Sequence, residues 1–224
     1  MSYNKILDRD VARIKRDIIE IIEQTKSQYA KTFDVLKTRD MEKAKEIIKY
    51  DQKINDLQND FTKMALWKIA KQQMVAGDLR LAIGGILISR EVERIADYAK
   101  LICSFYIKYE TEIENFEYIS LLFDLVNKML NTISLLVDNY EEAQEQKVVN
   151  LEMELNNKFK EFNNKMIAKM NEKSNDEKYV TKIVGIIRQL KNLERAGDHL
   201  INIEEILNFI RNGIFSEIPS HIES

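Results

Sequence analysis

The sequence predicts an all-α protein made of two tandem three-helix bundles that are related by internal duplication. Apolar residues recur at steps of three and four along the chain, which is the period of a helix with one buried face. The 224 residues contain one Pro and six Gly, so residues that interrupt helices are scarce. Residue types also repeat at an interval of 101 positions, the pattern left by duplication of one unit.

Six helices follow from the apolar spacing and from the breaks between the spaced segments. The predicted helices are residues 11–36, 40–69 and 78–109 in the first half, and 116–139, 141–171 and 176–210 in the second. Asp40 and Asp78 are the predicted N-caps of the second and third helices, and Gly77 is suited to a helix end. The expected domains are therefore residues 1–110 and 114–212, followed by an irregular tail at 213–224 that contains Pro219.

The repeat runs without a gap across two helices and the turn between them. The pairs of identical residues at this interval include Asn55 and Asn156, Phe61 and Phe162, Gly84 and Gly185, Glu93 and Glu194, Arg94 and Arg195, and Asp97 and Asp198. Gly inside a helix costs about 0.8 to 1 kcal/mol relative to Ala, so these glycines need a packing reason. We expect Gly84, Gly85 and Gly185 to lie where a neighbouring helix approaches closely. Trp67 falls at helical spacing and is expected to fill the core.

The repeated acidic residues are the candidate functional residues. Within each half, two carboxylates lie four positions apart on the third helix, so both project from one face. The second helix of each half carries a related acid–amide pair, and antiparallel packing would place the two pairs opposite each other. The candidate ligands are Asp51, Asn55, Glu93 and Asp97 in the first half, and Glu152, Asn156, Glu194 and Asp198 in the second.

These residues allow two interpretations. Oxygen-only ligands favour hard or borderline divalent ions such as Mg, Ca, Mn or Fe, and the repeated set holds no His or Cys, which disfavours zinc. Alternatively, nearby basic residues neutralise the acids as ordinary surface ion pairs worth about 0 to 1 kcal/mol each. The basic candidates are Lys53, Arg94, Lys191 and Arg195.

Composition and motifs exclude several classes of function. The net charge of −3 with mixed signs gives no basic face for nucleic acid, and no arrangement of Ser, His and Asp indicates a catalytic nucleophile, so we expect no enzyme activity. The single Cys103 is expected to be a packed core thiol in a reducing compartment. The charged N-terminus lacks a signal peptide, and no apolar run is expected to reach the roughly 18 to 20 residues of a membrane span. A cytoplasmic protein is therefore expected.

Two segments carry a resemblance to a known family. The stretches LRLAIGGILISREVERIADYAKLI and IIRQLKNLERAGDHLINIEEI resemble the two signature helices of the PhoU family. The second copy keeps Leu193-Glu194-Arg195, Gly197-Asp198-His199 and Asn202-Ile203, whereas the first has Ala96 in place of the usual Gly. The resemblance extends over nearly the whole chain in length, duplication and six-helix plan.

The resemblance implies a cytoplasmic negative regulator of phosphate uptake and phosphate-starvation signalling. Its implied partners are the ATPase subunit of the phosphate ABC transporter and a sensor histidine kinase, which would hold it peripherally at the membrane; a homodimer is the expected assembly. Members of the family bind metal, iron and zinc included, through paired acidic motifs, and Asn55 and Asn156 depart from that pattern because an amide oxygen is a weaker ligand than a carboxylate. Two alternatives stay open: an accessory protein of a secondary phosphate transporter, and a metal-storing helical bundle.

Overall fold

The computed structural model describes residues 3–71, 74–109, 116–138 and 141–214, and these residues form six helices and no strand. The helices are α1 (Tyr3–Thr38), α2 (Met41–Lys71), α3 (Ala76–Tyr109), α4 (Phe116–Asp138), α5 (Glu142–Glu172) and α6 (Glu177–Asn212). The predicted all-α class is confirmed. Three helices fall within each predicted domain.

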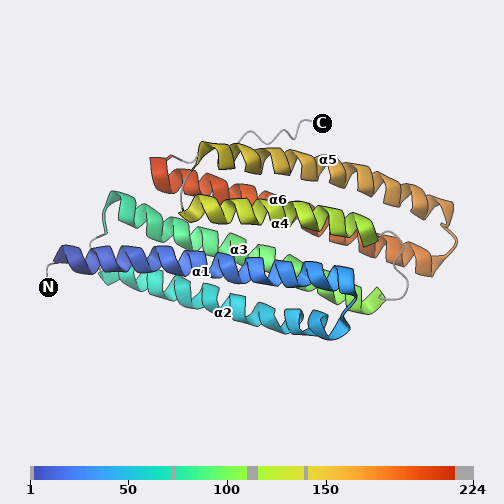
Figure 1. Ribbon diagram of the computed structural model, residues 1–224, viewed down its shortest axis with the longest axis horizontal. Coiled ribbons are helices and arrows are strands. Elements are labelled where there is room, and N and C mark those ends of the chain that lie inside the picture. The colour runs from blue at the N-terminus through green and yellow to red at the C-terminus, as the bar shows by residue number, and fades with distance from the viewer. Residues whose placement is uncertain (1–2, 72–73, 110–115, 139–140, 215–224) are drawn as a thin grey trace.

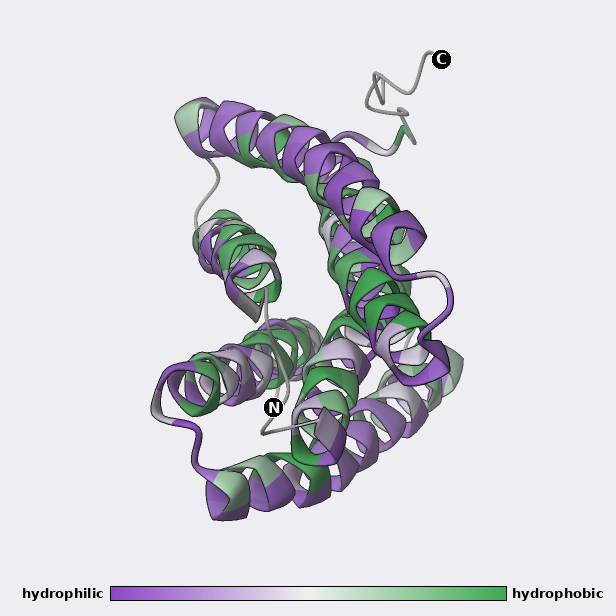
Figure 2. Cartoon of the chain, turned by 90° about the vertical axis from the view of Figure 1, so that its right-hand side faces the viewer, coloured by the Kyte–Doolittle hydropathy of each residue, from purple (hydrophilic) through white to green (hydrophobic). Residues whose placement is uncertain are grey.

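The helices lie roughly along one long axis in two antiparallel trios (Figure 1). Four helices, α1, α3, α4 and α6, pack on one another in the middle, while α2 covers α1 and α3 and α5 covers α4 and α6. Figure 2, a view along the helices, shows α5 and α2 at opposite outer edges of this arrangement. The largest contact between the halves is α3 against α6, so this antiparallel pair is the seam that joins the two copies.

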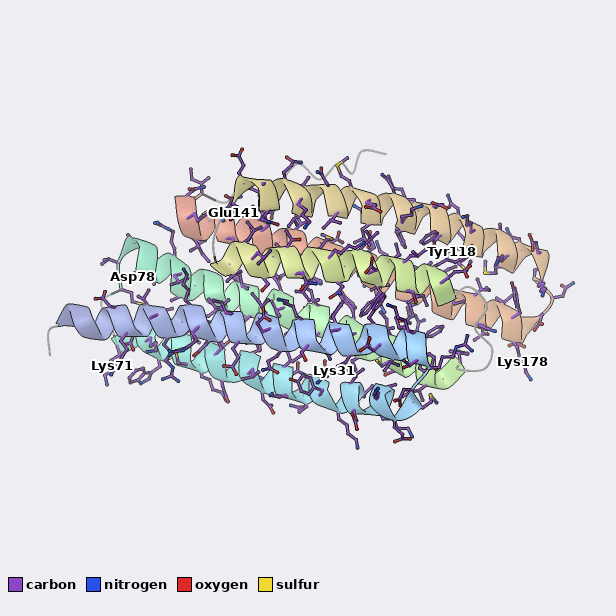
Figure 3. The ribbon with its side chains drawn as sticks, viewed as in Figure 1. Lys31, Lys71, Asp78, Tyr118, Glu141 and Lys178 are labelled. Atoms are coloured by element: carbon purple, nitrogen blue, oxygen red, sulfur yellow. The ribbon has the colours of Figure 1, made fainter. Side chains whose placement is uncertain are left out.

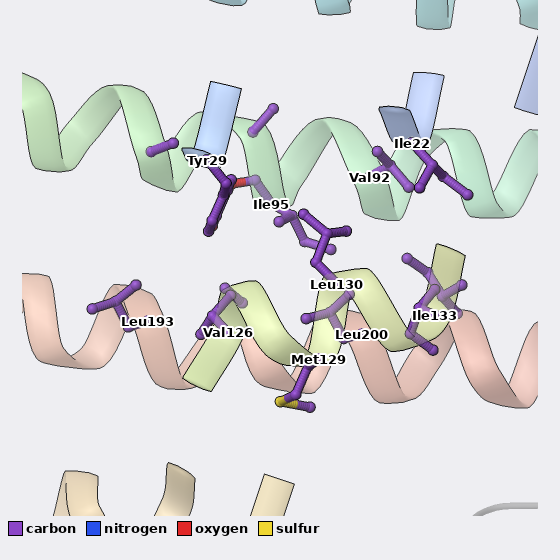
Figure 4. Packing of buried hydrophobic residues seen from close by; sticks show 14 of the residues in the cluster. Ile22, Tyr29, Val92, Ile95, Val126, Met129, Leu130, Ile133, Leu193 and Leu200 are labelled. Carbon is purple, nitrogen blue, oxygen red and sulfur yellow. The ribbon is translucent and has the colours of Figure 1, made fainter. Parts of the chain in front are cut away.

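One hydrophobic core runs through both halves. Figure 4 shows side chains from α1, α3, α4 and α6 pointing toward one another across the seam. Tyr29 of α1 is fully buried, and its ring stacks on Phe123 of α4 with 4.7 Å between centroids. Its hydroxyl donates a hydrogen bond of 2.9 Å to the Ile95 carbonyl of α3. Because the halves share this core, their division into separately folding domains stays a prediction.

The repeated glycines lie where a neighbouring helix approaches closely, as the sequence predicts, and for Gly84 and Gly185 that contact is the seam. A Cβ on Gly84 would stand 2.5 Å from Ile210 of α6 and 3.3 Å from Ile206, and one on Gly185 would stand 2.6 Å from Phe105 of α3. Gly84 and Gly185 are equivalent positions, and so are Phe105 and Ile206, so the same close approach occurs twice. Gly85 plays a different part, since it faces Ile18 and Phe61 within the first half.

Of the two predicted N-caps, one agrees with the structure and one is wrong. The Lys43 N–H donates to Asp40 Oδ1 at 3.1 Å, so Asp40 is the N-cap of α2 as expected. Helix α3 begins at Ala76 rather than just after Asp78. The residue with a positive φ (41°) at this boundary is Ala76, two positions before the predicted cap and not the glycine that the sequence suggested. Gly77 and Asp78 thus lie in the first turn, and Figure 3 shows Asp78 at the same end of the molecule as Lys71. At the other end of the chain Gly213 is a left-handed C-cap, and Pro219 lies outside the described residues.

Two expectations about apolar residues are wrong. Trp67 is 56% exposed near the end of α2 rather than packed in the core, because α2 is an outer helix with one buried face. The α4 segment Glu117–Val137 is long and apolar enough to meet the length and composition criteria of a membrane span. However, 56% of an 18-residue window in that segment is buried inside the protein, as expected for the core helix of a bundle. Cys103 is buried and its thiol donates to Thr32 Oγ1 at 3.8 Å, as predicted for a core cysteine.

Candidate functional site

The first carboxylate site, Asp51, Asn55, Glu93 and Asp97, lies along the antiparallel contact between α2 and α3. A lysine that the repeat does not contain binds its two helices together. Lys100 Nζ donates to Asp51 Oδ2 at 2.6 Å and to Asp97 Oδ1 at 2.5 Å. Asp51 is 3% exposed, and its Oδ1 and the Asn55 Oδ1 are buried atoms that accept no hydrogen bond from the part of the chain that the structure describes. These two unsatisfied oxygens leave acceptor capacity that a cation or a water would fill.

Electrostatics in this site reflect three acids and two bases, because Arg94 Nε also lies 3.9 Å from Glu93 Oε2, one of the surface pairs that the sequence allows. Burial, and after it the charge of Asp97, raises the pKa of Glu93 above its usual value. Partial burial disfavours the charged Lys100 ammonium, but its hydrogen bonds to Asp51 and Asp97 outweigh burial and raise the pKa of Lys100. Glu93 and Asn55 also line an open depression of about 440 Å³ together with Arg90.

The second carboxylate site, Glu152, Asn156, Glu194 and Asp198, occupies the equivalent contact between α5 and α6. Glu152, Asn156 and Glu194 line one pocket of about 160 Å³, and the Asn156 amide donates to Glu152. Lys191 Nζ lies 2.6 Å from Glu194 Oε2, which confirms one of the surface ion pairs that the sequence allows. Its side chain is 44% exposed.

Asp198 differs from its equivalent Asp97 in having no ion pair with the described residues, although the charges of Lys191 and Arg195 still act to lower its pKa. Burial and then repulsion from Glu194 raise the pKa of Asp198. No hydrogen bond or ion pair joins its side chain to the described residues. The position that corresponds to Lys100 is Ile201, so the lysine bridge of the first site has no counterpart.

The predicted ligands therefore lie in two rows, one along the α2–α3 contact and one along the α5–α6 contact, rather than in two compact clusters. Among the described residues, no group of three or more His, Cys, Asp or Glu side chains is arranged around one point for a metal ion. The unsatisfied oxygens of Asp51 and Asn55 still fit a cation, and the donor set is oxygen only, as hard ions require. Whether these residues bind metal stays a prediction.

Sequence reasoning missed Lys100 because it searched for residues that repeat. The signal was present, since Lys100 stands three positions after Asp97 on the same helix face. It also missed a polar cluster at the seam between the halves. His199 Nδ1 lies 2.7 Å from Glu91 Oε2, Asn202 Nδ2 donates to the same oxygen at 3.0 Å, and Tyr98 Oη lies 3.3 Å from His199 Nε2. Tyr98 and His199 are equivalent positions, so they meet where the two copies face each other.

The fold and these sites define a class of protein: a duplicated chain of six helices in which each half carries a row of acidic side chains between the second and third helices of its trio. The family model of the PhoU domain matches the chain twice, at residues 18–105 and 119–207. The chain belongs to the PhoU domain family, which confirms the resemblance inferred from the sequence.

Named relatives and solved structures agree with this assignment. A "Phosphate-specific transport system accessory protein PhoU homolog" of Xylella fastidiosa is 28% identical over 218 residues, covering 95% of this chain and 91% of that protein. A homolog of the same name from Borreliella burgdorferi is 30% identical over 183 residues, covering 80% of this chain and 82% of that protein.

Two crystal structures share the fold. The phosphate transport system regulatory protein PhoU from Streptococcus pneumoniae has a TM-score of 0.84 at 17% identity, covering 95% of this chain and 100% of that one. PhoU from Pseudomonas aeruginosa has a TM-score of 0.84 at 21% identity, covering 92% and 99% of the two chains.

Proposed function

We propose that this protein is a cytoplasmic, non-catalytic accessory protein of phosphate transport that negatively regulates phosphate uptake and phosphate-starvation signalling. The observation that carries the proposal is the match of the PhoU domain model to both halves. Relatives of the same extent are named accessory proteins of the phosphate-specific transport system, and one structural neighbour is named a regulatory protein.

The proposed mechanism is docking onto the ATPase subunit of the phosphate ABC transporter, the sensor histidine kinase, or both. The protein reaches the membrane only through these partners, and it acts as a homodimer. The exposed surface supports a docking role, because Leu66 and Trp67 are both more than half exposed on the outer helix α2. Large aromatic side chains of this kind are enriched in protein interfaces and often dominate their binding energy.

The docking-competent form is stabilised in this proposal by a metal ion at the second carboxylate site. Glu152, Glu194 and Asp198 do not converge on one point in the structure, so they would have to turn toward the ion to hold it, with the Asn156 oxygen as a weaker fourth ligand. The oxygen donors favour Mg, Ca, Mn or iron over zinc. Bound metal would neutralise the facing acids and tie α5 to α6.

A genetic and biochemical experiment tests the regulatory role. Deleting the gene in the source organism should raise phosphate uptake and phosphate-starvation gene expression in phosphate-replete medium, and the intact gene should reverse both. A tagged protein should capture the transporter ATPase or the kinase from phosphate-replete cells. Capture of a secondary phosphate transporter would instead identify an accessory protein of that system, whereas a chain that loads excess iron and captures neither would be a storage protein.

A double substitution, Glu194→Ala with Asp198→Ala, tests the metal step. Metal content and partner capture should both fall, because two of the proposed ligands are lost. Glu161→Ala is the matched control, since Glu161 is an α5 acid that pairs, among the described residues, only with Lys158 and Lys165 at the surface. Unchanged metal content and unchanged capture in the double variant would refute the metal step.

A further inference from the structure

A pocket of about 240 Å³ lies between α1 and α2 and shares no residue with either carboxylate site. Its buried part is formed by Gln28 of α1 and Ile47 of α2, and the partly buried Tyr50 of α2 lines it beside them. Most ligand pockets measure roughly 300 to 1,000 Å³, so this one suits a molecule of one or two rings.

Gln28 is the residue that distinguishes this pocket from a simple gap in the packing. Its side chain is 0% exposed, and neither its carbonyl oxygen nor its amide nitrogen has a hydrogen-bond partner among the described residues. An unpaired buried amide destabilises a fold, because both of its polar groups have lost their hydrogen bonds to water. A ligand with a donor and an acceptor side by side would satisfy both groups of Gln28 at once.

The second half of the chain indicates that the fold does not require an amide at this position. The two matches to the PhoU domain begin at residues 18 and 119, so the interval of 101 also relates α1 to α4. It carries Gln28 to Met129, which is fully buried in the core. Met and Gln have similar length and shape, so what the first half adds is the amide itself. The equivalent of Tyr50 is Leu151, so the aromatic ring is also particular to the first half.

The rim of the pocket carries charges of both signs that sum to zero. It consists of four exposed side chains, Lys31 and Asp34 of α1 and Lys43 and Glu46 of α2 (Figure 3 labels Lys31). Lys31 Nζ lies 4.8 Å from the centroid of the Tyr50 ring, and this exposed side chain can move aside for a ligand. An ion entering the pocket would be attracted by two rim residues and repelled by the other two. The pocket therefore favours an uncharged ligand.

We propose that this pocket binds a small, uncharged, planar molecule in which a hydrogen-bond donor stands beside an acceptor. The Gln28 carbonyl accepts from that donor and the Gln28 amide donates to that acceptor, while Ile47 and Tyr50 contact the ring of the ligand. Two kinds of molecule carry this arrangement: a primary carboxamide on an aromatic ring, and the edge of an adenine base, which a Gln side chain can bind with two hydrogen bonds. The inference goes beyond the proposed function, because it gives the first half a ligand that neither phosphate regulation nor metal requires.

Isothermal titration calorimetry on the full-length protein tests the proposal with two matched pairs of ligands. Nicotinamide and adenine carry the donor beside the acceptor, whereas nicotinate and purine keep the same rings without that donor. At least one of nicotinamide and adenine should bind with a Kd of about 1 mM or lower, and its matched partner should bind about tenfold more weakly. Binding of nicotinamide alone would identify a carboxamide ligand, and binding of adenine alone would identify a base; binding of both would support the shared chemistry.

Gln28→Met introduces the residue that the second half already has and removes only the hydrogen-bonding groups. The variant should bind the ligand at least about tenfold more weakly. It should also raise the Tm of the ligand-free protein, because an unpaired buried amide is gone. Gln52→Met is the matched control, since Gln52 is an exposed glutamine of α2 that bonds to Asp56 outside the pocket, and it should change neither measurement. If Gln28→Met does not fold by circular dichroism, the matched ligand pairs decide the matter.

Three results would overturn the inference. The first is that neither nicotinamide nor adenine binds the native protein, and the second is that a folded Gln28→Met variant binds as tightly as the native protein. The third is a lower Tm for ligand-free Gln28→Met, which would mean that internal water already satisfies the amide. None of these results bears on the regulatory role, which is measured separately by phosphate uptake and partner capture.

Discussion

Glu204 is a buried carboxyl group whose ionisation should set the pH dependence of stability. It is 1% exposed on α6, where Asn208 Nδ2 donates to its Oε1 at 2.8 Å and Arg211 lies 3.8 Å away. Burial, followed by repulsion from Glu145 of α5, raises the pKa of Glu204 from 4.5 to about 7. A protonated Glu204 can donate to Glu145, whereas an ionised one places two negative charges side by side.

The direction and size of the effect follow from this pKa. Since the folded state holds the Glu204 proton more tightly than the unfolded chain, the stabilisation is complete below pH 4.5 and is lost as the pH rises through about 7. At about 1.4 kcal/mol for each tenfold change in proton affinity, the loss is on the order of 3 kcal/mol. Glu204→Gln keeps the donor and the acceptor but cannot ionise, so the variant should escape this loss.

Urea unfolding followed by circular dichroism at pH 5 and pH 8 measures the effect. Native protein and Glu204→Gln should be close in stability at pH 5, and the variant should be more stable by about 3 kcal/mol at pH 8. Glu172→Gln removes the same charge at an exposed position and should differ little from the native protein at either pH. An equal difference between native and Glu204→Gln at both pH values would refute the reasoning.

Two further predictions concern packing and the buried ion pair. Gly185→Ala should destabilise the protein by about 1 to 3 kcal/mol, because the added Cβ would stand 2.6 Å from Phe105. Gly77→Ala should be neutral or stabilising by up to about 1 kcal/mol, because no atom lies within 4 Å of the added Cβ. Thermal unfolding compares the two, and equal effects would contradict the close approach at the seam. Asp10→Asn should lower the free energy of unfolding by about 3 to 5 kcal/mol, because it leaves the buried Lys68 ammonium without its carboxylate. Urea unfolding measures this loss, which a change below about 1 kcal/mol would rule out.

The parts of the fold that the sequence predicts are those decided by local chemistry or by repetition. Helix periodicity depends on each helix burying one face, and an aspartate cap such as Asp40 acts on residues three positions away. The close approach at Gly84 and Gly185 was predictable because glycine destabilises a helix, so its presence at both equivalent positions indicates that a neighbouring helix leaves no room for a side chain there. The start of α3 was not predictable, since a positive φ at Ala76 is disfavoured by local sterics and must be held by its surroundings.

The candidate sites were predictable in composition but not in pairing. The four-residue spacing alone puts Glu93 and Asp97 on one helix face, and antiparallel packing of the preceding helix puts Asp51 opposite them. Which base neutralises which acid depends on side-chain reach and burial. Lys191 pairs with Glu194 as expected, but the base that contacts the buried Asp51 carboxylate is Lys100, which was not among the predicted bases. A search restricted to repeated residues cannot find a residue such as Lys100, at which the two halves differ.

The seam between the halves shows where the two copies have kept their common design and where they have diverged. The glycine contacts occur on both sides of the point at which Tyr98 meets His199, because both copies bury the same helix face. Among the described residues, the polar contact of Glu91 is not repeated: Glu91 of α3 binds His199 and Asn202 of α6, while its equivalent, Asn192, bonds to Gln189 within α6.

Repeated apolar contacts are therefore enough to fix how the halves pack, which leaves the polar positions free to differ without changing the fold. The Glu91–His199 contact and the Lys100 bridge are both examples of a polar contact that only one half of the repeat makes. Each adds a charge interaction to one copy of a contact whose shape both copies share. In a duplicated protein of this kind, functional asymmetry should be sought at polar positions that break the repeat, because positions that obey it carry the same side chain in both halves.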